Sequence, residues 1–425
     1  MMPDLVSSHQ LQTQQTNTKK NTMWMLSLYG TAIGAGTLFL PIDAGLNGIW
    51  PLLMMAILAF PITYFSHQAL CRFVLSSSTA SANITDVVEE HFGGFAGNVL
   101  TVLYFLAIYP ILLLYSVAIT NTVQSFIINQ LGYVGISREW LALLLLMSFM
   151  AVIRIGQDMV LRAMSLLVYP FVTILVALSL YLIPYWNRAI IADHSSQPNL
   201  LTTLWLIIPL VIFSFNHSPI ISSFAVDQKQ RYGLAADAQC SLILKNSHVL
   251  MVVTVMFFVF SCVFSLSPHD LAIAKQQNIS ILSYLANHFH NPIIAYIAPL
   301  VAFIAIAKSF FGHYLGANEG LRGVLNIIRP NHVNLHSKTV SWITELFIFF
   351  TCWLTATMNP NILTIIETLG GPLIAIILFI MPIYAIHKVP SMKHYRHLLS
   401  NGLVLLIGII GMSAILSGAW GTLHG

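Results

Sequence analysis

Two hydrophobic segments of this chain are interrupted near their midpoints, and they occupy equivalent places in its two halves. The first covers residues 23–47 and carries the sequence GAG at 34–36, and the second covers residues 200–224 and carries FSFNHSP at 213–219. Backbone groups freed by such breaks cost several kcal/mol each in lipid, so breaks persist only where they line a protected cavity. Paired breaks in two repeats therefore indicate the substrate site of a secondary transporter.

The composition is that of a polytopic membrane protein. Hydrophobic residues make up 57% of the chain and charged residues 8%, whereas a soluble domain carries about 25% charged residues. Residues 1–22 are polar and show no signal-peptide pattern, so we expect a disordered cytoplasmic tail followed by one transmembrane domain over 23–425. The net charge of +4 has a topological explanation and does not indicate a nucleic acid partner. The four cysteines form no CxxC pair, and no disulfide is expected.

Hydropathy predicts eleven transmembrane helices, since about twenty apolar residues cross a bilayer. The predicted spans cover residues 23–47, 49–71, 95–128, 139–155, 161–183, 200–224, 247–266, 294–319, 338–357, 362–386 and 398–420. With the N-terminus inside, Arg138, Arg188 and Lys275 fall outside, Lys308 falls in the membrane, and all other Lys and Arg residues fall on the cytoplasmic side. This bias is what the positive-inside rule demands, so we expect a cytoplasmic N-terminus and a periplasmic C-terminus.

The spans group into two halves of five that each open with a broken helix. Repeat one covers residues 23–183, repeat two covers 200–386, and the helix at 398–420 lies outside the repeat. An odd number of spans per half forces the two halves into opposite orientations. The predicted fold is therefore an all-α, LeuT-type 5+5 inverted repeat with broken helices 1 and 6.

The first break can hold both charged groups of an amino acid. Where the helix resumes, free N–H groups and the positive end of the helix dipole suit a carboxylate, and the last carbonyls before the break suit an ammonium group. The candidate substrate-binding residues here are Ala32, Ile33, Gly34, Ala35, Gly36 and Thr37. The alternative is a glycine notch for helix packing, formed by Gly30 and Gly34.

The second break concentrates polar side chains at mid-membrane depth. Its candidate substrate-binding residues are Phe213, Ser214, Asn216, His217 and Ser218. Such groups can recognise a hydroxylated side chain, because a site built around a hydroxyl rejects analogues that lack one. The alternative is interhelical hydrogen bonding without a ligand, and the density of polar and helix-breaking residues favours the binding site.

One basic residue, Lys308, lies inside the predicted bilayer, and an intramembrane charge is by default a functional-site hypothesis. A buried lysine readily gains and loses a proton, so we expect proton coupling at Lys308, with Ser309 beside it and Glu367 as a relay or gate. The alternative is a static salt bridge from Lys308 to Glu367 or Glu345. No metal-ligand spacing, nucleotide-binding loop or GxSxG motif is found, so neither a metal site, a cofactor nor an enzyme is expected.

Four sequences together resemble a known family: TAIGAGTLFLP at 31–41, FSFNHSPIISSFA at 213–225, KSFFGHYLGANEG at 308–320 and IETLGGP at 366–372. They are similar to the bacterial hydroxy and aromatic amino acid permeases of the amino acid–polyamine–organocation superfamily, and most similar to the serine transporter branch. The resemblance implies L-serine–proton symport across the bacterial inner membrane. Threonine or aromatic substrates and sodium coupling stay open as alternatives within the class. A membrane sensor or a channel is disfavoured, because no signalling domain and no pore-type polar stripe is found.

Overall fold

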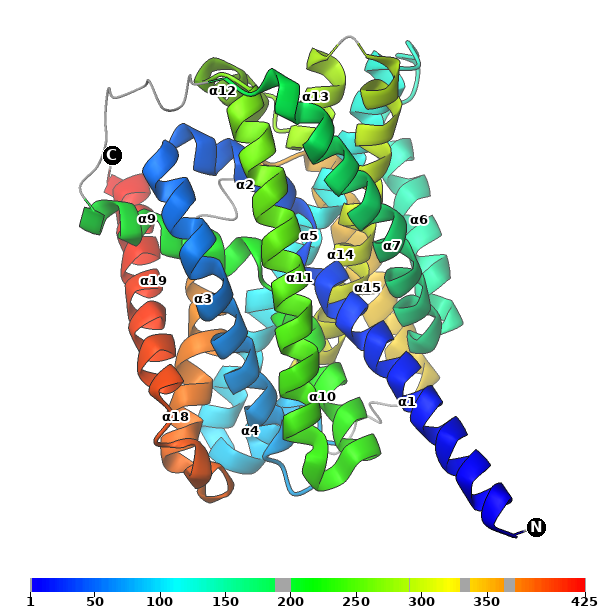
Figure 1. Ribbon diagram of the computed structural model, residues 1–425, viewed down its shortest axis with the longest axis vertical. Helices are drawn as coiled ribbons and strands as arrows, with labels where there is room; N and C mark the ends of the chain where they lie inside the picture. The colour runs from blue at the N-terminus through cyan, green and yellow to red at the C-terminus, as the bar shows by residue number, and fades with distance from the viewer. Residues whose placement is uncertain (1, 188–199, 290, 329–336, 363–370, 425) are drawn as a thin grey trace.

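The computed structural model describes residues 2–187, 200–289, 291–328, 337–362 and 371–424 (Figure 1). This part of the chain is helical and contains no strand. In the first half the helices are α1 (Met2–Ala32), α2 (Ala35–Leu46), α3 (Ile49–Leu75), α4 (Ile84–Phe92), α5 (Gly94–Asn129), α6 (Arg138–Ile155), α7 (Gln157–Leu182) and η1 (Ile183–Tyr185).

The second half repeats the pattern of a broken helix followed by long helices. Its elements are α9 (Leu200–Ser214), α10 (Ser218–Tyr232), η2 (Gly233–Ala235), α11 (Ala236–Ser265), α12 (Pro268–Gln276), α13 (Ile281–His288), α14 (Pro292–Ile328) and α15 (Lys338–Met358). They are followed by α17 (Gly371–Ala375), the π-helical turn η4 (Ile376–Ile380), α18 (Met381–Lys388), η5 (Pro390–Tyr395) and α19 (Leu399–His424).

Both predicted helix breaks are present in the structure. The chain leaves α1 after Ala32, and Gly34 adopts φ −146° and ψ −143°, so the axis bends by 48° before α2 continues. In the second half α9 ends at Ser214 and α10 begins at Ser218. Pro219 lies in the first turn of α10, where its missing N–H costs no helical hydrogen bond.

The number of spans is only partly tested by the structure. Six helices of the described residues are long and apolar enough to cross a membrane, and the bent α1–α2 pair makes a seventh. The remaining predicted spans are represented by α6, by α9 and by the helices after residue 370, which are shorter or more charged. Eleven membrane crossings therefore stay a prediction.

The N-terminal stretch also differs in appearance from the sequence-based expectation. Residues 2–22, expected to be a disordered tail, form the first part of α1 in this structure. The division of the chain into a tail and one transmembrane domain stays a prediction.

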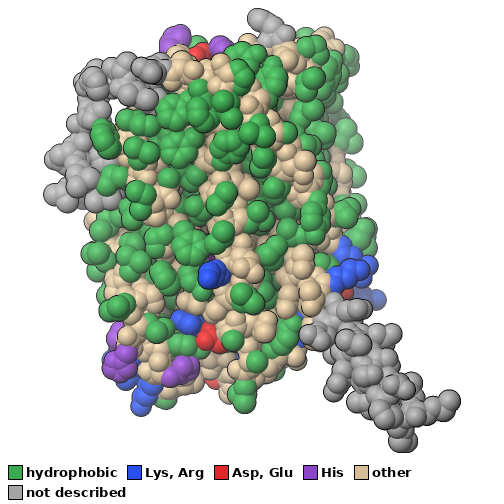
Figure 2. Space-filling model, viewed as in Figure 1, with side chains coloured by type: hydrophobic (Ala, Val, Ile, Leu, Met, Phe, Trp, Pro, Cys, Tyr) green, Lys and Arg blue, Asp and Glu red, His purple; other side chains and the backbone are tan. Residues whose placement is uncertain are grey.

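The outer surface matches a membrane environment. Hydrophobic side chains cover most of the face in Figure 2, and the Lys and Arg side chains on this face gather toward the end at which α1 begins. The short helices α12 and α13 cap the opposite end, while α4 and the C-terminal end of α10 lie near the end with the basic side chains (Figure 1). Between these ends α14 packs along α5 and also against α1 and α10, so the two breaks lie in the core.

Candidate functional site

The two breaks meet in the interior of the molecule. A Cβ atom added at Gly36 would lie 2.8 Å from the Phe213 ring and 3.3 Å from the Cα of Ser214. The Thr37 hydroxyl donates to the Ser214 carbonyl at 2.9 Å and also lies 3.3 Å from the Ala32 carbonyl. Thr37 therefore joins the end of α1, the start of α2 and the end of α9 at one point.

The described side chains of the first break are buried. Ala32, Ile33 and Thr37 are at most 3% exposed; for Ala35 only the backbone is described, and it starts α2. No side chain caps the N-terminus of α2, and the first N–H groups of a helix have no partner within it. This end of α2 therefore offers backbone donors and a positive dipole end to an anion.

Ser309 on α14 closes the other side of the first break. Its hydroxyl lies 3.2 Å from the Gly30 carbonyl and 2.9 Å from the Thr31 carbonyl. A Cβ at Gly34 would lie 2.1 Å from the Ser309 Oγ and 2.7 Å from the Tyr115 ring, so only glycine permits this approach of α14. The glycine notch and the break are thus the same feature.

The second break holds buried polar atoms without partners. Phe213, Ser214, Asn216, His217 and Ser218 are at most 7% exposed. Ser214 Oγ, Asn216 Nδ2 and His217 Nε2 have no hydrogen-bond partner among the described residues, whereas the Asn216 Oδ1 accepts from the Ser218 N–H at 3.1 Å. Because buried polar groups are normally paired, these atoms indicate a place for a polar ligand.

The His217 ring packs against two histidines that the sequence analysis did not single out. It stacks on His67 of α3 at 3.7 Å between ring centroids and lies 4.7 Å from the ring of His248 on α11. The His217 N–H donates to the His67 Nε2 at 3.2 Å. Their position inside predicted spans was the available signal, because polar residues at that depth are costly.

Lys308 is buried and has no polar partner in the described part of the chain. Its side chain is 0% exposed, its Nζ has no hydrogen-bond partner, and it lies 3.7 Å from the centroid of the Phe171 ring. The expected ammonium contact with carbonyls of the first helix is made by the Ser309 hydroxyl instead. Glu345, one alternative partner, pairs with Arg154 at 3.0 Å, and Glu367 lies outside the described residues.

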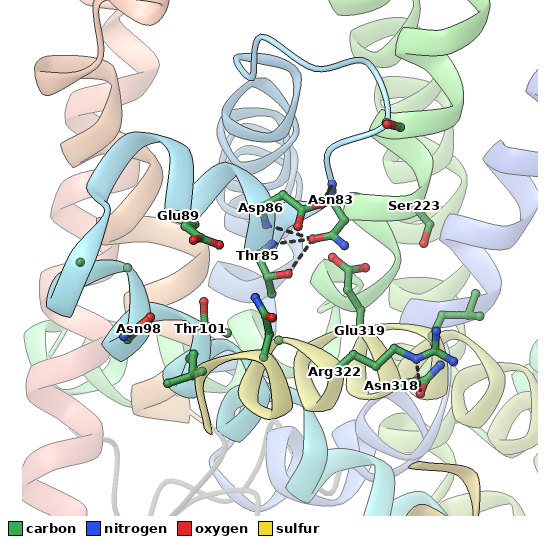
Figure 3. Close-up of a pocket in the computed structure, with 17 residues that line it drawn as sticks. Asn83, Thr85, Asp86, Glu89, Asn98, Thr101, Ser223, Asn318, Glu319 and Arg322 are labelled. Atoms are coloured by element: carbon green, nitrogen blue, oxygen red, sulfur yellow. Dashed lines mark hydrogen bonds between the residues drawn. The ribbon is translucent and has the colours of Figure 1, made fainter. Parts of the chain in front are cut away.

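Two polar cavities lie toward the two ends of the molecule. One, with a volume of about 520 Å³, is lined from α5, α12 and α13. The other, about 650 Å³, is lined from α4, α5, α10 and α14, and Figure 3 shows the Glu319 side chain at its wall. The Glu319 carboxylate accepts from the Ser222 hydroxyl at 2.7 Å and from the Ile84 N–H at 3.1 Å. These bonds hold α10 and α4 against α14 beside the second break.

Comparisons with known proteins agree with this architecture. Residues 18–417 match the model of the tryptophan/tyrosine permease family. The chain is 57% identical over 404 residues to the serine transporter SdaC of Escherichia coli K12, covering 93% of this chain and 94% of that protein. Identity to the serine transporter SdaC of Shigella flexneri is 56% with the same coverage.

A solved structure shows the same fold. The crystal structure of MhsT in complex with L-phenylalanine matches with a TM-score of 0.59 and 14% identity, over 93% of this chain and 97% of that one. The predicted all-α LeuT-type fold class is thereby confirmed.

Proposed function

Because the chain belongs to the tryptophan/tyrosine permease family, we propose that it imports L-serine across the bacterial inner membrane by proton symport. The serine transporters named above share more than half of their residues with it. The distribution of Lys and Arg supports a cytoplasmic N-terminus and a periplasmic C-terminus. The substrate occupies the meeting point of the two breaks.

The first break binds the two charges of the amino acid. The carboxylate takes the backbone N–H groups of residues 34–37, including those of Gly34, Ala35 and Gly36, at the positive end of α2. The ammonium group takes the carbonyls of Ala32 and Ile33. Supporting this is the bend at Gly34, which separates the donors of α2 from the acceptors of α1.

The second break reads the side chain of the substrate. The hydroxyl of L-serine accepts from the Asn216 amide and bonds to the Ser214 hydroxyl, while His217 and Ser218 hold the backbone of the break in shape. The observation that carries this proposal is the pair of buried, unpartnered atoms Ser214 Oγ and Asn216 Nδ2. Phe213 lies against Gly36 and limits the size of the side chain, which favours serine over an aromatic amino acid.

Competition between amino acids tests the role of the hydroxyl. L-alanine has the size of L-serine but leaves the Asn216 amide unpaired, at a cost of about 1–3 kcal/mol. We expect L-alanine to compete with labelled L-serine at a concentration at least about tenfold higher than unlabelled L-serine needs. Equal competition by the two amino acids would contradict hydroxyl recognition, and weak competition by L-threonine would place the limit on side-chain size.

We assign the coupling proton to Lys308, with Ser309 and Glu367 as its assistants. The Lys308 amine is buried among aromatic rings without a polar partner in the described region, and burial makes the charged form costly. The amine therefore exchanges a proton when access to one side of the membrane opens. Ser309 connects α14 to the carbonyls of α1, so a change of charge on its neighbour reaches the first break.

A further inference from the structure

Three buried histidines from three separate elements meet beside the second break. They are His67 on α3, His217 between α9 and α10, and His248 on α11, and one ring nitrogen of each lies within 4.8 Å of the other two. All three side chains are 0% exposed. This three-histidine cluster has no counterpart in local sequence spacing, because its members are far apart in the chain.

The hydrogen bonds of the cluster fix the tautomer of every ring. In each histidine the Nδ1 atom lies within hydrogen-bond distance of a backbone carbonyl. The pairs are His67 with Thr63 at 2.7 Å, His217 with Phe215 at 3.0 Å and His248 with Leu244 at 2.7 Å. Since a carbonyl only accepts, each Nδ1 carries the hydrogen and each Nε2 carries a lone pair.

The lone pairs of the cluster lack donors. The Nε2 atoms of His217 and His248 have no partner among the described residues, and the His67 Nε2 accepts only the His217 N–H. Histidines that bind metals typically donate the other ring N–H to a carbonyl or carboxylate, which sets the tautomer and the ring orientation. We propose that His67, His217 and His248 form a binding site for a monovalent transition-metal ion, copper(I).

The charge and geometry of the cluster select the ion. The three imidazoles are neutral ligands in a buried site, and the cost of burying an ion grows with the square of its charge, so a monovalent ion is favoured over zinc(II). Imidazole nitrogen is a suitable ligand for copper. His217 and His248, whose rings are tilted by 58°, provide the first two ligands.

The third ligand requires a local rearrangement. The His67 ring is stacked on His217 with an interplanar angle of 3°, and its Nε2 is occupied by the His217 N–H. To bind the ion, His67 must release that N–H and turn out of the stack. The metal would thereby link α3 and α11 to the second break.

Copper content of the purified protein tests the site without any measurement of transport. The detergent-solubilised protein is loaded with copper(I) under anaerobic, reducing conditions, desalted and analysed for metal. We expect wild type and His313→Gln to retain one copper ion more per chain than His67→Gln or His248→Gln. His313 is the matched control, because it is also buried and its Nδ1 also bonds to a backbone carbonyl, that of Ser309 at 2.9 Å.

The four cysteines need their own control, because thiolates also bind copper(I). All four are free and buried, namely Cys71, Cys240, Cys262 and Cys352. The comparison is therefore repeated with all four replaced by alanine, and X-ray absorption of the bound copper should show two or three nitrogen neighbours.

Two results would overturn the proposal. One is equal copper content in wild type and in His248→Gln, and the other is sulfur ligation that disappears together with the cysteines. Only variants that elute as folded protein are compared, and His248→Asn replaces His248→Gln if that variant does not.

Discussion

At the residue scale, the account depends on the glycine at which the two breaks touch. A side chain at Gly36 would collide with Phe213 and with the backbone of Ser214. We therefore expect uptake of labelled L-serine by Gly36→Val to fall to background in cells, while the protein still reaches the membrane. Gly402→Val is the matched control, since a Cβ there meets nothing within 4 Å. Normal uptake by Gly36→Val would contradict a substrate site at this contact.

The glycines and polar residues of both breaks could be predicted from the sequence, because helix-breaking residues at membrane depth have few explanations. The contacts around them could not. That Ser309, and not Lys308, reaches the carbonyls of α1 depends on which face α14 turns toward the break. The meeting of His67 with His248 likewise depends on helix packing, which a single sequence does not specify.

At the scale of elements, the Thr37 hydroxyl is the link between the half-helices. Thr37→Val keeps the shape of the side chain but removes the hydrogen bond to the Ser214 carbonyl. We expect the half-saturation concentration for L-serine to rise about five- to thirtyfold, which corresponds to about 1–2 kcal/mol. Thr173→Val, which removes a bond from an exposed threonine to the Tyr169 carbonyl within α7, should leave it unchanged. Equal values for the two variants would mean that the link between the breaks does not shape the site.

The break positions and the order of long helices followed from hydropathy and glycine placement alone. The short helix α4 and the π-helical turn η4 were not predicted. The helix α4 begins with an Asn83–Asp86 capping box, a local signal that hydropathy does not detect. The π-turn follows from how α17 and α18 pack on α19, and no local pattern indicates it.

At the scale of the whole molecule, the buried amine on α14 is proposed to link proton movement to substrate movement. Lys308→Met keeps the length of the side chain but removes its charge. We expect this variant to lose accumulation of L-serine driven by a pH gradient, while exchange of internal for external L-serine continues. Both activities are measured in the same proteoliposomes. Accumulation at the wild-type level by Lys308→Met would move the proton site elsewhere, with Glu367 as the next candidate.

The most direct test of the central claim, proton-coupled L-serine transport, uses the wild-type protein in proteoliposomes with choline in place of sodium. A pH gradient, acidic outside, is imposed, and labelled L-serine is followed inside the vesicles. We predict accumulation above the external concentration that a protonophore abolishes and that added sodium leaves unchanged. Accumulation that requires a sodium gradient, or L-serine that only equilibrates under the pH gradient, would contradict the account.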